Sequence, residues 1–176
     1  MASNPHYIAV KDFIDKKPNE NPTKFTFYPK ALNIVWGNDG RYWSIPKNDS
    51  GGSDTRAAAE LLQVSWLEVT GSMDLQPGKK YRVGFNVELK PDAFGWNGCP
   101  VYLMAKVGKK GRYKWKKINL QDQGEKPPYY IADQFSIDSA PSTDKTLYFG
   151  LYEVWSGKWK GGLKLNHAIV EEVTPQ

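Results

Sequence analysis

The chain of 176 residues has little of what many classes of function require. It contains one cysteine, Cys99, and two histidines, His6 and His167. A single cysteine excludes an internal disulfide and leaves too few thiols for a cysteine-based zinc site. The sequence shows no Ser-His-Asp order, phosphate-binding loop or cluster with metal-ligand spacing. We therefore expect a protein that is not an enzyme and that needs no cofactor.

Long apolar runs are also missing. No stretch approaches the roughly 20 apolar residues that span a bilayer, so we expect no membrane span. The first segment, MASNPHYIAVKDFIDKK, has no apolar region of the kind a secretion signal needs, and we expect a cytoplasmic location. The net charge of +5 is compatible with an anionic partner but does not identify one.

Helical patterns are scarce, whereas 16 glycines and 12 prolines interrupt the chain. In the clearest strand, residues 81–90, apolar and polar side chains alternate, which buries one face. Residues 64–75 are interpreted as its partner strand. Further strands are predicted at 100–108, 113–120, 146–155 and 163–173, with turns at 108–111 and at Gly157. Short strands joined by turns predict an all-β fold of two packed antiparallel sheets, a β-sandwich.

Three segments are less regular. Residues 1–24 are polar and broken by prolines, and we interpret them as a loosely ordered N-terminal extension of a domain at 25–176. Residues 46–55 are predicted to form a flexible loop. Residues 56–63 have helical propensity but run straight into a strand pattern, so a helical turn and a strand start both remain open.

The segment LNIVWGNDGRYWSI, residues 32–45, places aromatic residues on both sides of a polar turn. We predict a hairpin in which Trp36 lies opposite Arg41 and Trp43 lies opposite Ile34, so that both indoles share one face at the end of the sheet. Leu32 and Ile34 have the same parity as Trp36. The two rings can therefore be core or can line an open cleft, and the residues alone favour neither.

Three segments, at 31–45, 61–89 and 147–173, resemble the signature blocks of plant phloem lectins, the phloem protein two or Nictaba-type family. The resemblance implies a jelly-roll type of β-sandwich, similar to carbohydrate-binding modules. It implies binding without catalysis of N-acetylglucosamine oligomers (chitooligosaccharides) and of N-glycan cores on glycoproteins. It also implies a homodimer, located in the cytoplasm, the nucleus or the phloem sap, and sugar binding by Trp36, Trp43 and Glu153.

Glu153 continues the apolar alternation of Leu147, Phe149 and Leu151. A carboxylate in a core row must be paired or must reach the rim, where a ligand would lie. Charge-assisted hydrogen bonds from sugar hydroxyls would suit it there. Weaker candidates for the same site are Asn38, Tyr42, Trp96, Asn97, Trp155 and Trp159.

A basic and aromatic segment, Lys106–Lys117, supports an alternative function. Lysine and arginine alternate there with Tyr113 and Trp115, a mixture that can bind phosphates and stack bases, so RNA is an alternative partner. The simpler interpretation is the solvent-facing side of an edge hairpin, where lysine also prevents aggregation.

Overall fold

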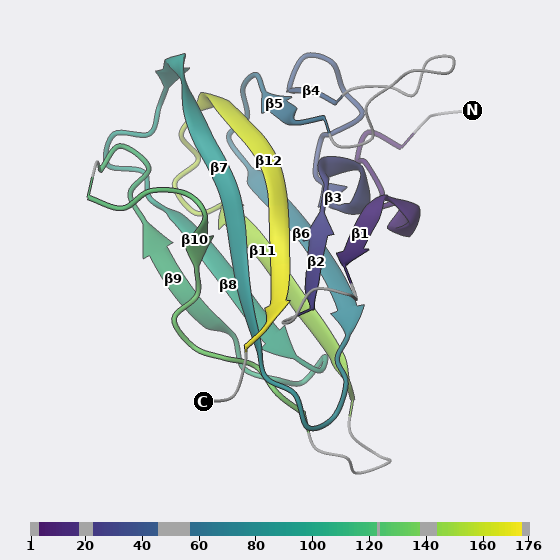
Figure 1. Ribbon diagram of the computed structural model, residues 1–176. Helices are drawn as coiled ribbons and strands as arrows, with labels where there is room; N and C mark the ends of the chain where they lie inside the picture. Colours follow the sequence, from purple (N-terminus) through teal and green to yellow (C-terminus); the bar gives the residue numbers. More distant parts are fainter. Residues whose placement is uncertain (1–3, 18–22, 46–56, 123, 138–143, 174–176) are drawn as a thin grey trace.

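Two antiparallel β-sheets lie face to face in the computed structural model (Figure 1), which describes residues 4–17, 23–45, 57–122, 124–137 and 144–173. The five-stranded sheet has the order β3-β6-β11-β8-β9. Its strands are Asn33–Ile34 (β3), Leu67–Asp74 (β6), Val101–Val107 (β8), Lys114–Ile118 (β9) and Thr146–Glu153 (β11). The predicted all-β antiparallel sandwich is confirmed.

The seven-stranded sheet is organised around β12, which pairs with β2, β5 and β7. Its strands are Ile14–Lys17 (β1), Lys24–Phe27 (β2), Trp43–Ser44 (β4), Ala59–Leu61 (β5), Tyr81–Phe94 (β7), Tyr129–Tyr130 (β10) and Gly161–Glu172 (β12). Two short 3-10 turns, η1 (Lys11–Phe13) and η2 (Pro29–Ala31), complete the elements of the described residues. No helix in this part of the chain is long and apolar enough to cross a membrane.

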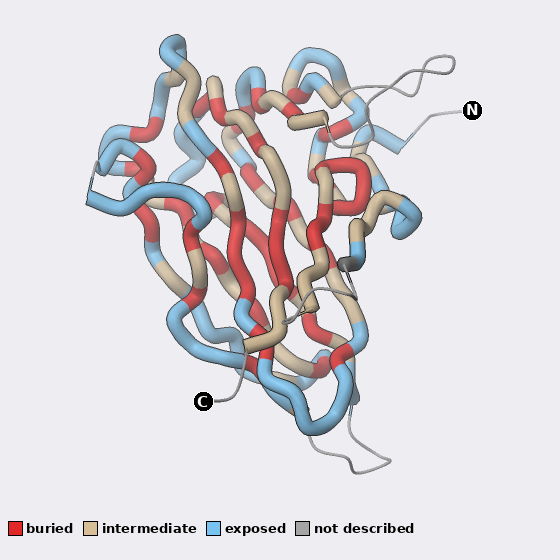
Figure 2. The backbone as a smooth tube through the Cα atoms, in the orientation of Figure 1, coloured by how far each residue is buried: buried red, intermediate tan, exposed pale blue. Residues whose placement is uncertain are grey.

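Alternating side chains build the core between the sheets. Phe149 of β11 packs edge-on against Phe27 of β2 and Phe85 of β7, with ring centroids 5.0 and 6.1 Å apart. Figure 2 shows the buried positions running along the facing strands. Each fully buried side chain of this size contributes about 1.5–3 kcal/mol. The same alternation directs every second side chain of β8 and β11 away from the core, onto the outer face of the five-stranded sheet.

Two predicted strand pairings are wrong. β6 pairs with β3 and β11, whereas β7 pairs with β10 and β12, so the two are not partners. The predicted hairpin at 32–45 is also absent, because β3 joins the five-stranded sheet and β4 the seven-stranded sheet. The chain crosses between the sheets over residues 35–42, where Trp36 has a φ of 65°. Alternation reveals which face of a strand is buried, but it does not name the neighbouring strand.

The described residues near the start of the chain include backbone partners of the sandwich. Tyr7 pairs with Ile34, and β1 pairs with β2. Tyr7 and β1, which lie within the predicted 1–24 extension, are therefore hydrogen-bonded to the sandwich. The loop predicted at 46–55 lies outside the described residues. For the described part of the segment 56–63, the open question is settled in favour of a short strand, since β5 pairs with β12 through Leu61 and Leu163.

Candidate functional site

One end of the sandwich, the upper end in Figure 1, gathers the connections that follow β3, β5, β7 and β11. The backbone links them: Val64 pairs with Lys160, and the N–H of Leu62 donates to the carbonyl of Tyr42. The site residues predicted from the sequence lie in or beside these connections: Trp36, Asn38, Tyr42, Trp43, Trp96, Asn97, Glu153, Trp155 and Trp159. They fall into separate groups with different exposure.

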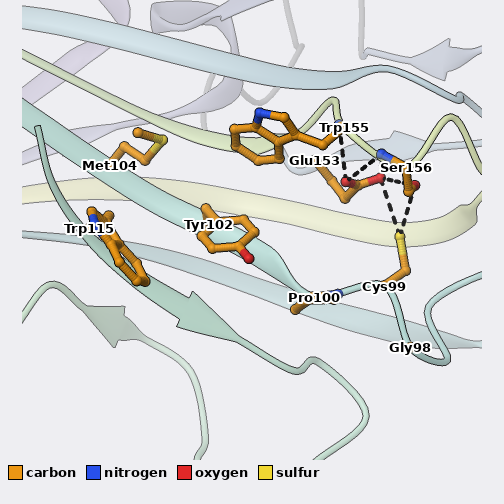
Figure 3. A pocket seen from close by; sticks show the side chains of 9 residues that line it. All are labelled: Gly98, Cys99, Pro100, Tyr102, Met104, Trp115, Glu153, Trp155 and Ser156. Carbon is orange, nitrogen blue, oxygen red and sulfur yellow. Dashed lines mark hydrogen bonds between the residues drawn. The ribbon is translucent and has the colours of Figure 1, made fainter.

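A cleft of about 510 Å³ opens beside this end, on the outer face of the five-stranded sheet (Figure 3). We call it the Tyr102 cleft. Its lining consists of Gly98, Cys99, Pro100, Tyr102, Met104, Trp115, Glu153, Trp155 and Ser156. Tyr102 and Met104 reach it because their neighbours in β8 point into the core, and Trp115 lies beside Met104 through the pairing of β8 with β9.

Three aromatic rings shape the Tyr102 cleft. The ring of Tyr102 lies between two indoles, 5.0 Å from Trp155 and 5.8 Å from Trp115 between centroids, at interplanar angles of 77° and 60°. Trp155 is 60% exposed and Trp115 is 59% exposed. Large exposed rings around a recess offer an apolar surface to a flat ligand.

Glu153 closes one end of the cleft and is almost completely buried, at 3% exposure. Its Oε1 accepts hydrogen bonds from Lys160 Nζ at 2.8 Å, from Cys99 Sγ at 3.3 Å and from the Ser156 hydroxyl. Its Oε2 accepts from the backbone N–H groups of Trp155 and Ser156, both at 3.4 Å. The carboxylate expected in the core row is therefore paired.

These hydrogen bonds decide the charge of the cluster. Burial alone would raise the pKa of Glu153, but the hydrogen bonds from Lys160, Ser156 and Cys99 outweigh it and lower the pKa to about 2. Burial raises the pKa of the Cys99 thiol above its usual value. At neutral pH the cluster thus holds a carboxylate and a protonated thiol that donates to Glu153.

Three of the predicted residues form a second group of rings. The ring centroids of Trp36 and Tyr42 lie 5.6 Å apart. Tyr42 in turn stacks on Trp159, with 6.3 Å between the ring centroids and an interplanar angle of 30°. The imidazole of His6 packs against the indole of Trp36, with 4.9 Å between the ring centroids. Asn38 connects this region to the N-terminal segment, because its Nδ2 donates hydrogen bonds to the carbonyls of Asn4 and His6. We call Trp36, Tyr42 and Trp159 the aromatic row.

Two predicted ligand residues lie in the core instead. Trp43 is 2% exposed, and its Nε1 has no hydrogen-bond partner among the described residues. Trp96 is 1% exposed and donates from Nε1 to the carbonyl of Gly161 at 2.8 Å. The prediction that the indoles of Trp36 and Trp43 share one sheet face is wrong, because β3 and β4 belong to different sheets. The question whether Trp43 is core or lines a cleft, which the residues alone left open, is answered by its burial in the core. Asn97, next to Trp96, is exposed on the β7–β8 connection.

Sequence reasoning missed several residues of this end. Tyr102 and Met104 carried a readable signal, because apolar side chains at the outward positions of a strand leave part of its wet face apolar. Trp115 was assigned only to the basic hairpin. Lys160 carried no signal, since a lysine beside a turn is usually solvated. In the part of the chain that the structure describes, no group of three or more His, Cys, Asp and Glu side chains could hold a metal ion.

Comparison with known proteins identifies the family. The Phloem protein 2 family model matches residues 23–171. The chain is 48% identical over 159 residues to protein PHLOEM PROTEIN 2-LIKE A9 of Arabidopsis thaliana, covering 82% of this chain and 85% of that protein. It is 33% identical to a lectin of Coccinia grandis, covering 85% of this chain and 94% of the lectin.

One solved structure resembles the chain at low sequence identity. The GH26-CBM35 β-(1,4)-mannanase of Podospora anserina matches with a TM-score of 0.49 and 8% identity, over 87% of this chain and 28% of that one. The family assignment rests on the sequence comparisons, which agree with the resemblance of the three signature segments. Since the family model spans most of its length, the chain belongs to the phloem protein 2 family.

Proposed function

We propose that this chain binds oligomers of N-acetylglucosamine and the cores of N-linked glycans, without catalysis, in the Tyr102 cleft. The observation that carries the proposal is the pair of exposed indoles, Trp115 and Trp155, on either side of Tyr102. The family supports a sugar ligand, because relatives from Coccinia grandis and Luffa acutangula are named lectins.

The chemistry of the cleft matches that of an acetylated sugar. A pyranose ring carries apolar C–H patches on its faces, and the electron-rich face of an indole covers such a patch well. Met104, which lines the cleft from β8, offers a soft apolar surface for the methyl of an N-acetyl group. The hydroxyls at the sugar edge need polar partners, and the Tyr102 hydroxyl in the cleft lining can supply one.

The expected affinity is modest. An open recess with one or two stacked rings gives dissociation constants in the micromolar to millimolar range, about −4 to −8 kcal/mol. Two clefts in the homodimer that the family resemblance implies would raise the avidity for a branched glycan.

The test is calorimetric titration of chitotriose into the wild-type protein and into Trp155→Ala and Trp115→Ala. Each substitution removes an exposed ring, so we expect roughly tenfold weaker binding, about 1.4 kcal/mol, with an unchanged melting temperature. Trp66→Ala is the matched control, since Trp66 is also exposed but does not line the cleft.

The outcomes separate the function from its location. If the wild-type protein binds neither chitotriose nor an N-glycan core, the proposed function is wrong. If it binds chitotriose and both cleft variants bind equally well, the ligand lies elsewhere, and the aromatic row is then the next surface to test. Release of shorter sugars during incubation would show that the protein is an enzyme after all.

A further inference from the structure

The turn between β11 and β12, residues 154–160, is fixed by hydrogen bonds from the buried ammonium group of Lys160. Lys160 is 0% exposed, and its Nζ donates to three acceptors. These are Glu153 Oε1 at 2.8 Å, the carbonyl of Ser65 at 3.0 Å and the carbonyl of Lys158 at 2.9 Å. An ammonium group has three donors, so all of them are used. Lys160 thereby ties the end of β11, the β5–β6 connection and the turn to one another.

Both oxygens of the Glu153 carboxylate likewise accept hydrogen bonds from within the protein. Oε1 accepts from Lys160, Ser156 and Cys99, and Oε2 accepts from two backbone N–H groups of the turn. A carboxylate offers about four lone-pair positions, so little capacity remains for a sugar hydroxyl. A ligand that bonded to Glu153 would have to displace one of these internal partners.

The residues that this turn carries explain why a buried ion pair is useful here. Trp155 lies edge-on to Tyr102 in the cleft, and Trp159 stacks on Tyr42 in the aromatic row. Both indoles are more than half exposed, so packing alone fixes them weakly. A buried ion pair is often no better for stability than apolar residues of the same size. Its benefit lies in fixing the turn before a ligand arrives, which reduces the entropy lost on binding.

We propose that Lys160 is a positioning residue of the sugar site, and that Glu153 acts through the pair with Lys160 rather than by accepting a sugar hydroxyl. This inference rests on the proposed sugar-binding function. It assigns Glu153 a different task from the direct contact that the family resemblance implies.

The test compares Lys160→Met, Glu153→Gln and the double variant by titration with chitotriose. Lys160 has no exposed surface and cannot touch a ligand. We nevertheless expect Lys160→Met to weaken binding as much as Glu153→Gln, by about tenfold or more. The double variant should bind no more weakly than the weaker single variant, because both changes remove the same support. Lys164→Met is the matched control: Lys164 lies in β12, which begins directly after Lys160, and its loss breaks the exposed pair with Glu88.

A spectroscopic measurement separates positioning from a general loss of stability. With 5-fluorotryptophan incorporated, the ligand-free variants should show shifted or broadened ¹⁹F resonances for Trp155 and Trp159. The resonance of Trp115, which lies on β9 away from the turn, should stay in place. This measurement needs no ligand, so it tests positioning even if the wild-type protein does not bind chitotriose and the proposed function fails.

The contrary result is equally clear. If folded Lys160→Met binds chitotriose like the wild-type protein while Glu153→Gln binds weakly, and the Trp155 resonance is unchanged in both, Glu153 contacts the sugar directly and the inference is wrong. Should Lys160→Met fail to fold because it leaves Glu153 charged and unpaired, the double variant carries the test. Wild-type affinity and unchanged Trp155 and Trp159 resonances in that variant would also overturn the inference.

Discussion

At the scale of single residues, exposure divides the tryptophans into two kinds. Trp43 and Trp96 belong to the core, whereas Trp115 and Trp155 flank an open cleft. A buried indole contributes apolar burial and packing to folding, and an exposed indole retains a free face for a ligand. The family resemblance implies a sugar contact for Trp43, yet only 2% of this residue is exposed. Trp43 therefore distinguishes a core role from a ligand role most directly.

We predict that Trp43→Phe lowers stability moderately and leaves chitotriose affinity unchanged, while Trp43→Ala destabilises the fold by about 3–5 kcal/mol. Phenylalanine keeps most of the buried ring, and it deletes an Nε1 group that finds no partner among the described residues. Urea denaturation measures the first effect and calorimetric titration the second. A stable Trp43→Phe variant that no longer binds chitotriose would place Trp43 in the binding site.

For Glu153, the sequence predicted the position of the side chain but not its partner. Its phase with Leu147, Phe149 and Leu151 predicted a carboxylate in the core row, and the structure buries it there. The partner could not be predicted, because Lys160 reaches Glu153 only when the turn folds back. Pattern reasoning works along a strand, whereas this ion pair depends on the path of the chain between two sheets.

At the scale of elements, alternation located the long strands and their inward faces, but not their neighbours. The predicted strand at 81–90 corresponds to β7, and the predicted strand at 146–155 corresponds to β11. The pairing of 64–75 with 81–90 was wrong, since a period of two is satisfied equally well by any partner strand. Chain order favoured a hairpin, whereas the sandwich places β6 and β7 in opposite sheets.

The end of the sandwich that carries the candidate site is built from connections between strands, and the alternation of apolar and polar residues does not predict how these connections pack. Gly95 follows β7 with a φ of 85°, and a Cβ there would lie 2.2 Å from the carbonyl oxygen of Trp159. Backbone therefore packs directly against backbone where the β7–β8 connection meets the β11–β12 turn. An alanine at this position would have to push the turn aside as well as adopt a left-handed conformation.

We predict that Gly95→Ala destabilises the protein clearly more than Gly78→Ala. Gly78 has nearly the same φ, 83°, but nothing lies within 4 Å of its added Cβ. It is therefore a matched control that isolates the left-handed backbone penalty of about 1–2 kcal/mol. The difference in the free energy of unfolding between the two variants measures the clash with the turn. Equal losses would mean that the two connections are not in close contact.

At the scale of the whole molecule, the ligand class determines how binding responds to salt. The chain carries a net charge of +5, and the segment Lys106–Lys117 led to RNA as the alternative ligand. In the structure several of these lysines have partners within the protein. Lys106 Nζ lies 4.8 Å from the Tyr113 ring, Lys116 pairs with Glu125, and Lys114 donates to the carbonyl of Gln134. These three lysines thus already interact with groups of the protein itself.

We predict that the dissociation constant of chitotriose changes less than about twofold between roughly 0.05 and 0.5 M NaCl, because ring stacking on a neutral sugar releases no counterions. A single-stranded RNA of mixed sequence is the comparison ligand in the same titration. If phosphates were the natural ligand, its affinity would exceed that for the sugar at low salt. It would then fall steeply, with a logarithmic slope close to −0.7 for each phosphate neutralised. Replacing Lys110 and Lys117 with glutamine would flatten that slope and leave chitotriose binding unchanged. A steep salt dependence of chitotriose binding itself would contradict the stacking mechanism, since it would show that charge, and not the indole faces of the Tyr102 cleft, holds the ligand.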